Sequence, residues 1–204
     1  MATKAKAASE IKIMVGSTVY GFEDQLSALV AQLVTMGYDV INSHTGRIKV
    51  NPNLSNLDNC LNAVEECHLF LGIIRPYYGT GNIGELNITF EEIKKAIELE
   101  KPYWFLVHRD VVFARQLFNK MKTKEDGKKL FDVVEVTKNS QFDPRCIDVY
   151  EYVIKNHVPV ELRNGNWAQE FYRLDDMMIY VTSQFSDKDF VNNILKQKEA
   201  NNGQ

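Results

Sequence analysis

Residues 69–74 read Leu-Phe-Leu-Gly-Ile-Ile and form the densest apolar run in the sequence. The run has no polar alternation, so a strand made from it is expected to be buried on both faces. Strands of that kind belong to the centre of parallel sheets, where helices cover both sides. The run therefore predicts an α/β protein with this segment as a central strand.

Three further β-rich runs lie on either side of it, at residues 11–15, 38–41 and 103–107. The segments between the runs carry apolar residues at helical spacing, for example Leu26, Leu29, Val30 and Leu33. Strands that alternate with helices over short connections form parallel sheets with right-handed crossovers. We therefore predict a doubly wound parallel sheet with the strand order 2-1-3-4.

The C-terminal half is predicted to be mainly helical. We expect an α/β domain at residues 10–136, with residues 131–136 as a candidate fifth strand, and a helical C-terminal extension at 137–200 that packs on it. A helix is predicted to begin at Asn166, because Asn166-x-x-Gln169 imitates a capping box. Its apolar stripe is expected to be core and consists of Trp167, Phe171, Leu174, Met178, Val181 and Phe185.

Charge and cysteine content exclude several classes of protein. The 24 Lys and Arg residues against 27 Asp and Glu residues give a net charge of −3, so we expect neither nucleic acid nor a membrane as a partner. The three cysteines have no metal-ligand spacing, which argues against a zinc site and a disulfide framework and suits a reducing compartment. No apolar stretch approaches the ~18 residues of a membrane span, and we expect a cytoplasmic protein without a bound metal.

Small and hydroxyl residues follow the first predicted strand. Open α/β sheets bind ligands beyond the carboxyl ends of their strands. There Gly16, Ser17 and Thr18 offer backbone amides and hydroxyls that suit a phosphate or a ribose, although they equally suit a plain helix N-cap. The sequence has no Gly-x4-Gly-Lys-Ser/Thr motif, so it predicts no NTPase loop.

The ends of the third and fourth strands add a cation and aromatic rings. Arg75, Tyr77, Tyr78 and Gly79 follow the third strand, where a guanidinium could hold a phosphate and a ring could stack on a base. His108 ends the fourth strand. The alternatives are that the tyrosines pack the following loop and that His108 only caps its strand. Together these residues predict a nucleotide-sized site where the first, third and fourth strands end.

Three segments resemble the domain-of-unknown-function 4062 family, namely IKIMVGST at 11–18, LFLGIIRPYYG at 69–79 and TFEEIKKAIELEKP at 89–102. The family is similar to TIR domains and nucleoside deoxyribosyltransferases, and the resemblance covers roughly residues 10–110. It implies a TIR-like or flavodoxin-like fold that cleaves the N-glycosidic bond of NAD or a related nucleoside or nucleotide, without a separate cofactor. It also implies bacterial antiphage defence or signalling, as a homo-oligomer or as a subunit of a larger system.

The resemblance implies a catalytic role for Glu92. Members of the family tend to read Thr-Glu-x-Glu-Tyr where this chain reads Thr89-Phe90-Glu91-Glu92-Ile93, so only the second glutamate aligns. Glu85 and Glu91 are the other candidate acids. Thr89-x-x-Glu92 is also a capping-box pattern, in which the glutamate only satisfies a backbone amide. The alternative functions are a non-catalytic nucleotide-sensing or protein-interaction module and a purely structural domain.

Overall fold

The computed structural model describes residues 10–79, 82–83, 86–120 and 142–202. None of the helices within these ranges is long and apolar enough to cross a membrane. The elements in chain order are β1 (Lys12–Ser17), α1 (Glu23–Thr35), β2 (Asp39–Ile41), α2 (Asn56–Glu66), β3 (Leu69–Ile74), β4 (Asn82–Ile83), β5 (Leu86–Asn87), α3 (Ile88–Glu98), β6 (Tyr103–His108), α4 (Arg109–Lys120), α5 (Arg145–Val153), the 3-10 helix η2 (Val160–Leu162), β7 (Ala168–Phe171), α6 (Leu174–Phe185) and α7 (Lys188–Asn202).

Five strands form one parallel sheet in the order β2-β1-β3-β6-β7. The predicted α/β class, the four predicted strands and their order are therefore confirmed. Every residue of β3 is buried, as its unbroken apolar run predicts. In the register between the two central strands, Gly16 pairs with Gly72.

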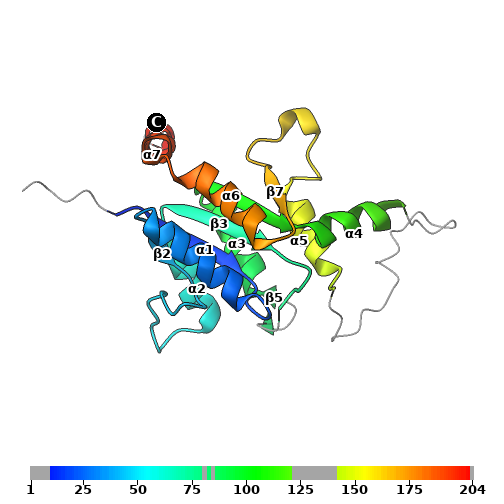
Figure 1. The fold of residues 1–204 in the computed structure, drawn as a ribbon, viewed down its shortest axis with the longest axis horizontal. Coiled ribbons are helices and arrows are strands. Elements are labelled where there is room, and N and C mark those ends of the chain that lie inside the picture. The colour runs from blue at the N-terminus through cyan, green and yellow to red at the C-terminus, as the bar shows by residue number, and fades with distance from the viewer. Residues whose placement is uncertain (1–9, 80–81, 84–85, 121–141, 203–204) are drawn as a thin grey trace, which may run out of the picture.

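Helices cover both faces of the sheet (Figure 1). One core layer joins the sheet to α1, α6 and α7 and includes Leu29, Met177 and Val191. The other joins the opposite face to α2, α3, α4 and α5 and includes Val64 and Ile93. Because α1 leaves β1 on one face and α3 follows β3 on the other, the sheet has a switch point between these two strands.

The fifth strand comes from a segment that we predicted to be helical. Residues 168–171 form β7, which pairs with Phe105–His108 at the edge of the sheet, so the helix predicted to begin at Asn166 is wrong. The helix α6 begins instead at Leu174, where Asp176 accepts hydrogen bonds from the amides of Tyr172 and Arg173. Pairing with β6 satisfies backbone groups that an earlier start of the helix would have satisfied internally.

The predicted apolar stripe is therefore divided between two elements. Phe171 on β7 and Val181 and Phe185 on α6 are buried, whereas Trp167 is 71% exposed. The candidate strand at 131–136 and the expected domain boundary between 136 and 137 lie outside the described residues. Beyond them, α5, α6 and α7 supply the expected C-terminal helices.

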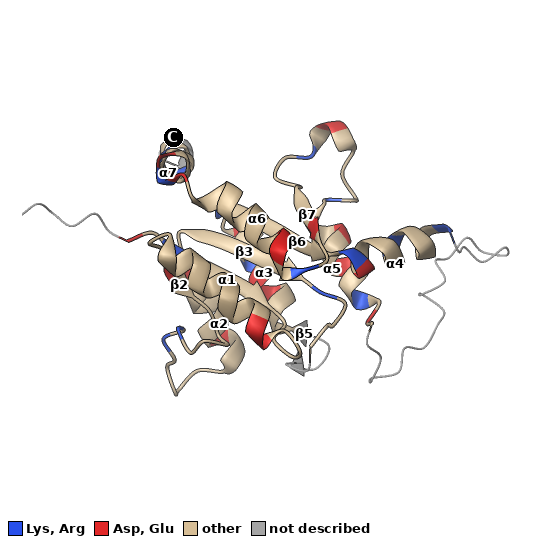
Figure 2. Cartoon of the chain, viewed as in Figure 1, with Lys and Arg blue, Asp and Glu red and all other residues tan. Residues whose placement is uncertain are grey.

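Two helix boundaries agree with local sequence patterns. Ser55 caps α2 by accepting a hydrogen bond from the amide of Asp58, as the Ser-x-x-Asp pattern predicts. Gly37 follows α1 with φ +80, the left-handed conformation that favours glycine after a helix. Basic and acidic residues are scattered along the elements, and both signs occur across this view (Figure 2).

Candidate active site at the carboxyl edge of the sheet

A pocket of about 430 Å³ opens at the carboxyl edge of the sheet, at the switch point between β1 and β3. We call it the Glu92 pocket. Its walls come from the loops after β1, β2 and β3 and from the first turns of α2 and α3. It is lined by Ser17, Thr18, Val19, Tyr20, Ser43, Gly46, Ile48, Val50, Asn56, Asn59, Cys60, Tyr77, Gly79, Asn87, Ile88, Thr89 and Glu92.

Glu92 is the most unusual of these residues because it is a carboxylic acid that is only 4% exposed. Burial raises the pKa of Glu92 to about 7, and a hydrogen bond with Cys60 opposes part of that rise. Burial and the nearby carboxylate in turn raise the pKa of the Cys60 thiol to about 12, so Cys60 stays protonated as a donor. Among the residues that the structure describes, no lysine or arginine lines the pocket. Glu92 therefore changes its charge near neutral pH.

Glu92 does not close a capping box with Thr89, and that interpretation is wrong. The N-cap of α3 is Asn87, whose side chain accepts a hydrogen bond from the amide of Phe90 over 3.0 Å. Asparagine is also the better N-cap residue, so this start could have been read from the sequence. The earlier start places Glu92 in the second turn of α3, where its carboxyl group lines the pocket.

The hydroxyl groups predicted for the site are present and also join its loops. Ser17 donates a hydrogen bond to the carbonyl of Thr18, and Thr18 donates one to the carbonyl of Tyr77, each over 3.0 Å. Gly79 has φ +91 and packs against Thr18. The hydroxyl oxygens keep lone pairs that can accept hydrogen bonds from a ligand.

A pair of aromatic rings borders the same pocket. The rings of Tyr20 and Tyr77 are stacked with their centroids 5.2 Å apart, and Tyr20 is 71% exposed. Aromatic faces of this kind bind planar apolar groups by stacking. Tyr77 was predicted as part of the site, and Tyr20 was not.

Four predicted site residues do not line this pocket, namely Gly16, Arg75, Tyr78 and His108. Arg75 donates from Nη1 to the carbonyls of Thr18 and Tyr20, over 2.9 and 3.1 Å, and so supports the loop after β1. Tyr78 is buried in the core, with the guanidinium of Arg145 4.2 Å from its ring centre. His108 lines a neighbouring pocket together with Arg75. The end of the fourth strand thus belongs to a separate cavity.

Two pocket residues near the start of α2 were not among the predicted site residues. Asn59 is buried and bonds the loop before the helix through the amide and carbonyl of Asn51. Cys60 lies beside it and reaches Glu92. The Ser55-x-x-Asp58 cap places the start of α2 at the carboxyl edge, and this pattern is the signal that could have identified both residues.

The other candidate acids lie outside the pocket or outside the description. Glu91 pairs with Lys94 over 2.5 Å and is not among the lining residues. Glu85 belongs to a segment outside the described ranges. In the part of the chain that the structure describes, no group of three or more His, Cys, Asp or Glu residues could hold a metal ion.

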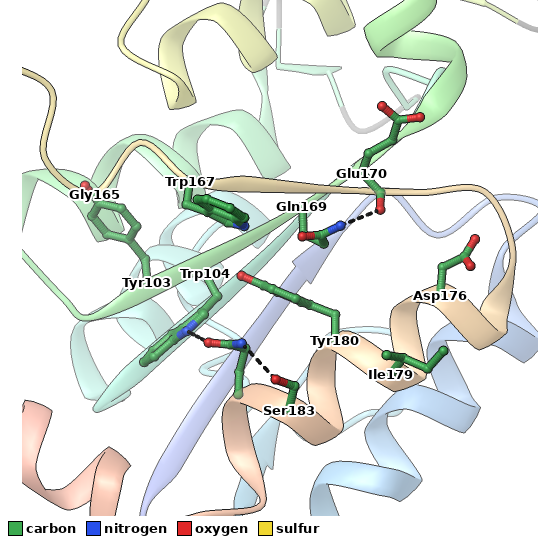
Figure 3. A pocket seen from close by; sticks show the side chains of 11 residues that line it. Tyr103, Trp104, Gly165, Trp167, Gln169, Glu170, Asp176, Ile179, Tyr180 and Ser183 are labelled. Atoms are coloured by element: carbon green, nitrogen blue, oxygen red, sulfur yellow. Dashed lines mark hydrogen bonds between the residues drawn. The ribbon is translucent and has the colours of Figure 1, made fainter. Parts of the chain in front are cut away.

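A larger hollow of about 560 Å³ lies beside the edge strand β7 and α6, and Figure 3 shows it closely. Aromatic side chains line it, and the indole of Trp104 donates to Gln184, which in turn donates to Ser183. Its acids, Glu170 and Asp176, are exposed. Tyr180 also lines the hollow, and burial raises its pKa to about 12, away from neutral pH. Because no buried acid, thiol or histidine of the described chain lines this hollow, we place the candidate chemistry in the Glu92 pocket.

The fold and the pocket together define a doubly wound α/β protein with a ligand-sized site at its switch point. The chain belongs to the family described as Domain of unknown function (DUF4062), which its residues 12–163 match. No curated protein matches the sequence.

Proposed function

We propose that the Glu92 pocket binds a nucleoside or nucleotide, with NAD as the first candidate, and that Glu92 supports cleavage of its N-glycosidic bond. The observation that carries this proposal is a buried carboxyl group with a pKa of about 7 that lines a pocket of about 430 Å³. Perturbed acids in pockets of this size are characteristic of active sites. The resemblance to TIR and nucleoside deoxyribosyltransferase domains supplies the reaction type.

The surroundings of Glu92 suit a ribosyl group. Hydroxyl and amide side chains from Ser17, Thr18 and Asn87 can bond to sugar hydroxyls, and the Tyr20–Tyr77 pair offers an aromatic face to a base. In the proposed reaction the bond from C1′ to the base nitrogen breaks, and both electrons leave with the base. The ionised carboxylate of Glu92 stabilises the ribosyl cation. A water oxygen then bonds to C1′ and releases a proton to Glu92. This proton passes to solvent when the base leaves as a neutral molecule, as nicotinamide does, and to the base when it leaves as an anion.

The test measures nucleobase release from NAD and from common nucleosides by the wild type and by Glu92→Gln, with the thermal midpoint of each protein. We expect the variant to fold and to lose turnover by a factor on the order of a hundred or more. Glu91→Gln is the matched control, because Glu91 is on the same helix but outside the pocket. Equal release by the wild type and Glu92→Gln would end the catalytic assignment.

The pH dependence provides a second readout. If the carboxylate is the active form, kcat/KM should rise with pH and reach a plateau above the pKa of Glu92 in the ligand-free protein, which is about 7. A rate that falls across this range would show instead that Glu92 acts as a protonated acid.

A second candidate is a non-catalytic nucleotide-sensing module. One observation favours it: Glu92 is the only acid that lines the pocket in the described chain, whereas most glycosidases use two carboxyl groups. Nucleotide binding without nucleobase release from any substrate would support this alternative. By resemblance the proposal also includes the formation of homo-oligomers, which sedimentation of the pure protein would test. It further includes a role in antiphage defence, which phage challenge of cells that carry the wild type or Glu92→Gln would test.

A further inference from the structure

A second pocket of about 500 Å³ lies next to the Glu92 pocket, and Tyr77 lines both. We call it the Arg75 pocket. It is formed at the ends of β3, β6 and β7 and at the first turn of α6. Arg75, His108 and Arg173 line it, and no acidic residue of the described ranges does. The two neighbouring cavities therefore have opposite chemistry, one with a carboxyl group and no cation and the other with cations and no carboxyl group.

The arginines of the second pocket form no ion pair with a described acid, although Glu23 interacts electrostatically with Arg75 and Asp176 with Arg173. Among the described residues, no carboxylate oxygen lies within 4.0 Å of the guanidinium nitrogens of Arg75 or Arg173. Arg75 is half-buried, and this burial lowers its pKa, with Glu23 as the acid that most opposes the shift. Its Nη1 donates to two carbonyls, and its guanidinium lies over the ring of Phe22, 4.2 Å from the ring centre, so the contacts of Arg75 include no ion pair. A half-buried cation that forms no ion pair favours an anionic ligand.

His108 provides a hydrogen-bond donor in the same cavity. Its Nδ1 accepts a hydrogen bond from the amide of Asp110, so in the neutral ring the proton is on Nε2. Burial lowers the pKa of His108; Asp110 opposes this shift, Arg75 and Arg109 add to it, and Glu170 opposes it weakly. The carboxylate of Asp110 is 3.5 Å from Nδ1 and is the nearest acid. Arg173 faces the same cavity from the start of α6.

The backbone amides of Tyr172 and Arg173, just before α6, are not free to bind an anion, because both donate to the carboxylate of Asp176. The side chains of Arg75 and Arg173 are the charged groups that line the pocket. Arginine forms two parallel hydrogen bonds with a phosphate, which makes it the usual partner of such groups.

We propose that the Arg75 pocket binds a phosphate or diphosphate group of the ligand whose nucleoside part occupies the Glu92 pocket. The placement of the nucleoside in the Glu92 pocket rests on the proposed function. The placement of the phosphate rests only on the residues of the Arg75 pocket. The natural ligand is accordingly a phosphorylated nucleoside, and an unphosphorylated one binds more weakly. The Tyr20–Tyr77 pair lies where the two parts of the ligand join.

The experiment measures the affinities of adenosine, adenosine monophosphate and inorganic pyrophosphate by titration calorimetry. Arg173→Gln is the test variant, because Arg75 also supports the loop after β1. Lys196→Gln on α7 is the control, since Lys196 is exposed and the change in net charge is the same. We expect the wild type to prefer the monophosphate to adenosine by about tenfold or more. Arg173→Gln should lose about that factor for the monophosphate and pyrophosphate and keep its affinity for adenosine.

Titration of the His108 ring by NMR gives an independent readout, with the signal assigned through His108→Gln. Saturating pyrophosphate should raise the pKa of His108, because a bound anion favours the imidazolium. An unchanged pKa together with equal binding by Arg173→Gln and the wild type would overturn the proposal, as would a wild type that binds neither phosphate compound. Arg173-dependent binding without nucleobase release would retain the anion site and reject only the cleavage reaction.

Discussion

The carboxyl group of Glu92 lies directly against the backbone of Gly16, so closely that a Cβ atom at residue 16 would be 3.0 Å from Oε2. The same Cβ would be 2.9 Å from Cζ of Phe70. Real Cβ atoms rarely approach other groups this closely. Glycine at the end of β1 therefore leaves space for the acid, a role separate from the predicted one of offering its amide to a ligand.

Gly16→Ala should displace the Glu92 carboxyl group and reduce ligand binding, and it should lower the free energy of unfolding by about 1–3 kcal/mol. Gly72→Ala is the comparison, because its Cβ would meet Phe105 Cδ1 at 2.7 Å and not Glu92. Urea unfolding should show a loss in both variants. Only Gly16→Ala should change the pKa of Glu92, and the same change in both would contradict the specific contact.

Glu92 should make the protein less stable as the pH rises. Its pKa is about 7 in the folded protein against 4.5 for an ordinary glutamate, so between these values the unfolded chain has lost a proton that the folded chain keeps. The stability that this proton contributes is complete below pH 4.5 and is lost as the pH rises through 7. The full difference amounts to about 3 kcal/mol.

Glu92→Gln removes this dependence. At pH 8 the variant should be more stable than the wild type by up to about 3 kcal/mol, and near pH 4.5 the two should be similar. Urea unfolding of both proteins across this pH range gives the difference between their free energies of unfolding. The contributions of all other titrating groups cancel in this difference. A constant difference over the whole range would mean that Glu92 is ionised normally.

Phe171 and Trp167 should respond in opposite ways to truncation. Phe171 is 3% exposed and packs with Phe22 and His108, so Phe171→Ala should cost about 3–5 kcal/mol. Trp167→Ala should cost less than about 1 kcal/mol, because the indole is mostly in solvent. Equal losses would show that Trp167 is covered in solution.

The start of α3 can be tested with two alanine substitutions. Asn87→Ala should cost about 1 kcal/mol, because it removes the N-cap bond to the amide of Phe90. Thr89→Ala should cost less than about 0.5 kcal/mol, since Thr89 is inside the helix and does not cap it. Thermal unfolding of both variants distinguishes this start from the capping box that the sequence also allowed.

Local patterns in the sequence determined the sheet. The continuous apolar run of β3 needs cover on both faces, and the helical stripes such as Leu26 to Leu33 provide it, so parallel strands with alternating helices followed from hydrophobic burial alone. Because all strands of a parallel sheet run in the same direction, the residues that follow them lie at one edge of the sheet, the carboxyl edge. Ser17, Tyr77 and Glu92 accordingly line one pocket, as their places at strand and helix ends predicted.

Tertiary contacts decided what each of the other side chains does. The stripe from Trp167 to Phe185 suits one helix, but pairing of 168–171 with β6 satisfies backbone groups that only the folded sheet presents. The sequence predicted Arg75 as a phosphate ligand in the same site as Ser17 and Tyr77. In the structure its Nη1 donates to carbonyls of the loop after β1, and the side chain lines the Arg75 pocket instead. The charge of Glu92 depends on burial by segments far from it in the chain, and such long-range desolvation has no signature in local spacing.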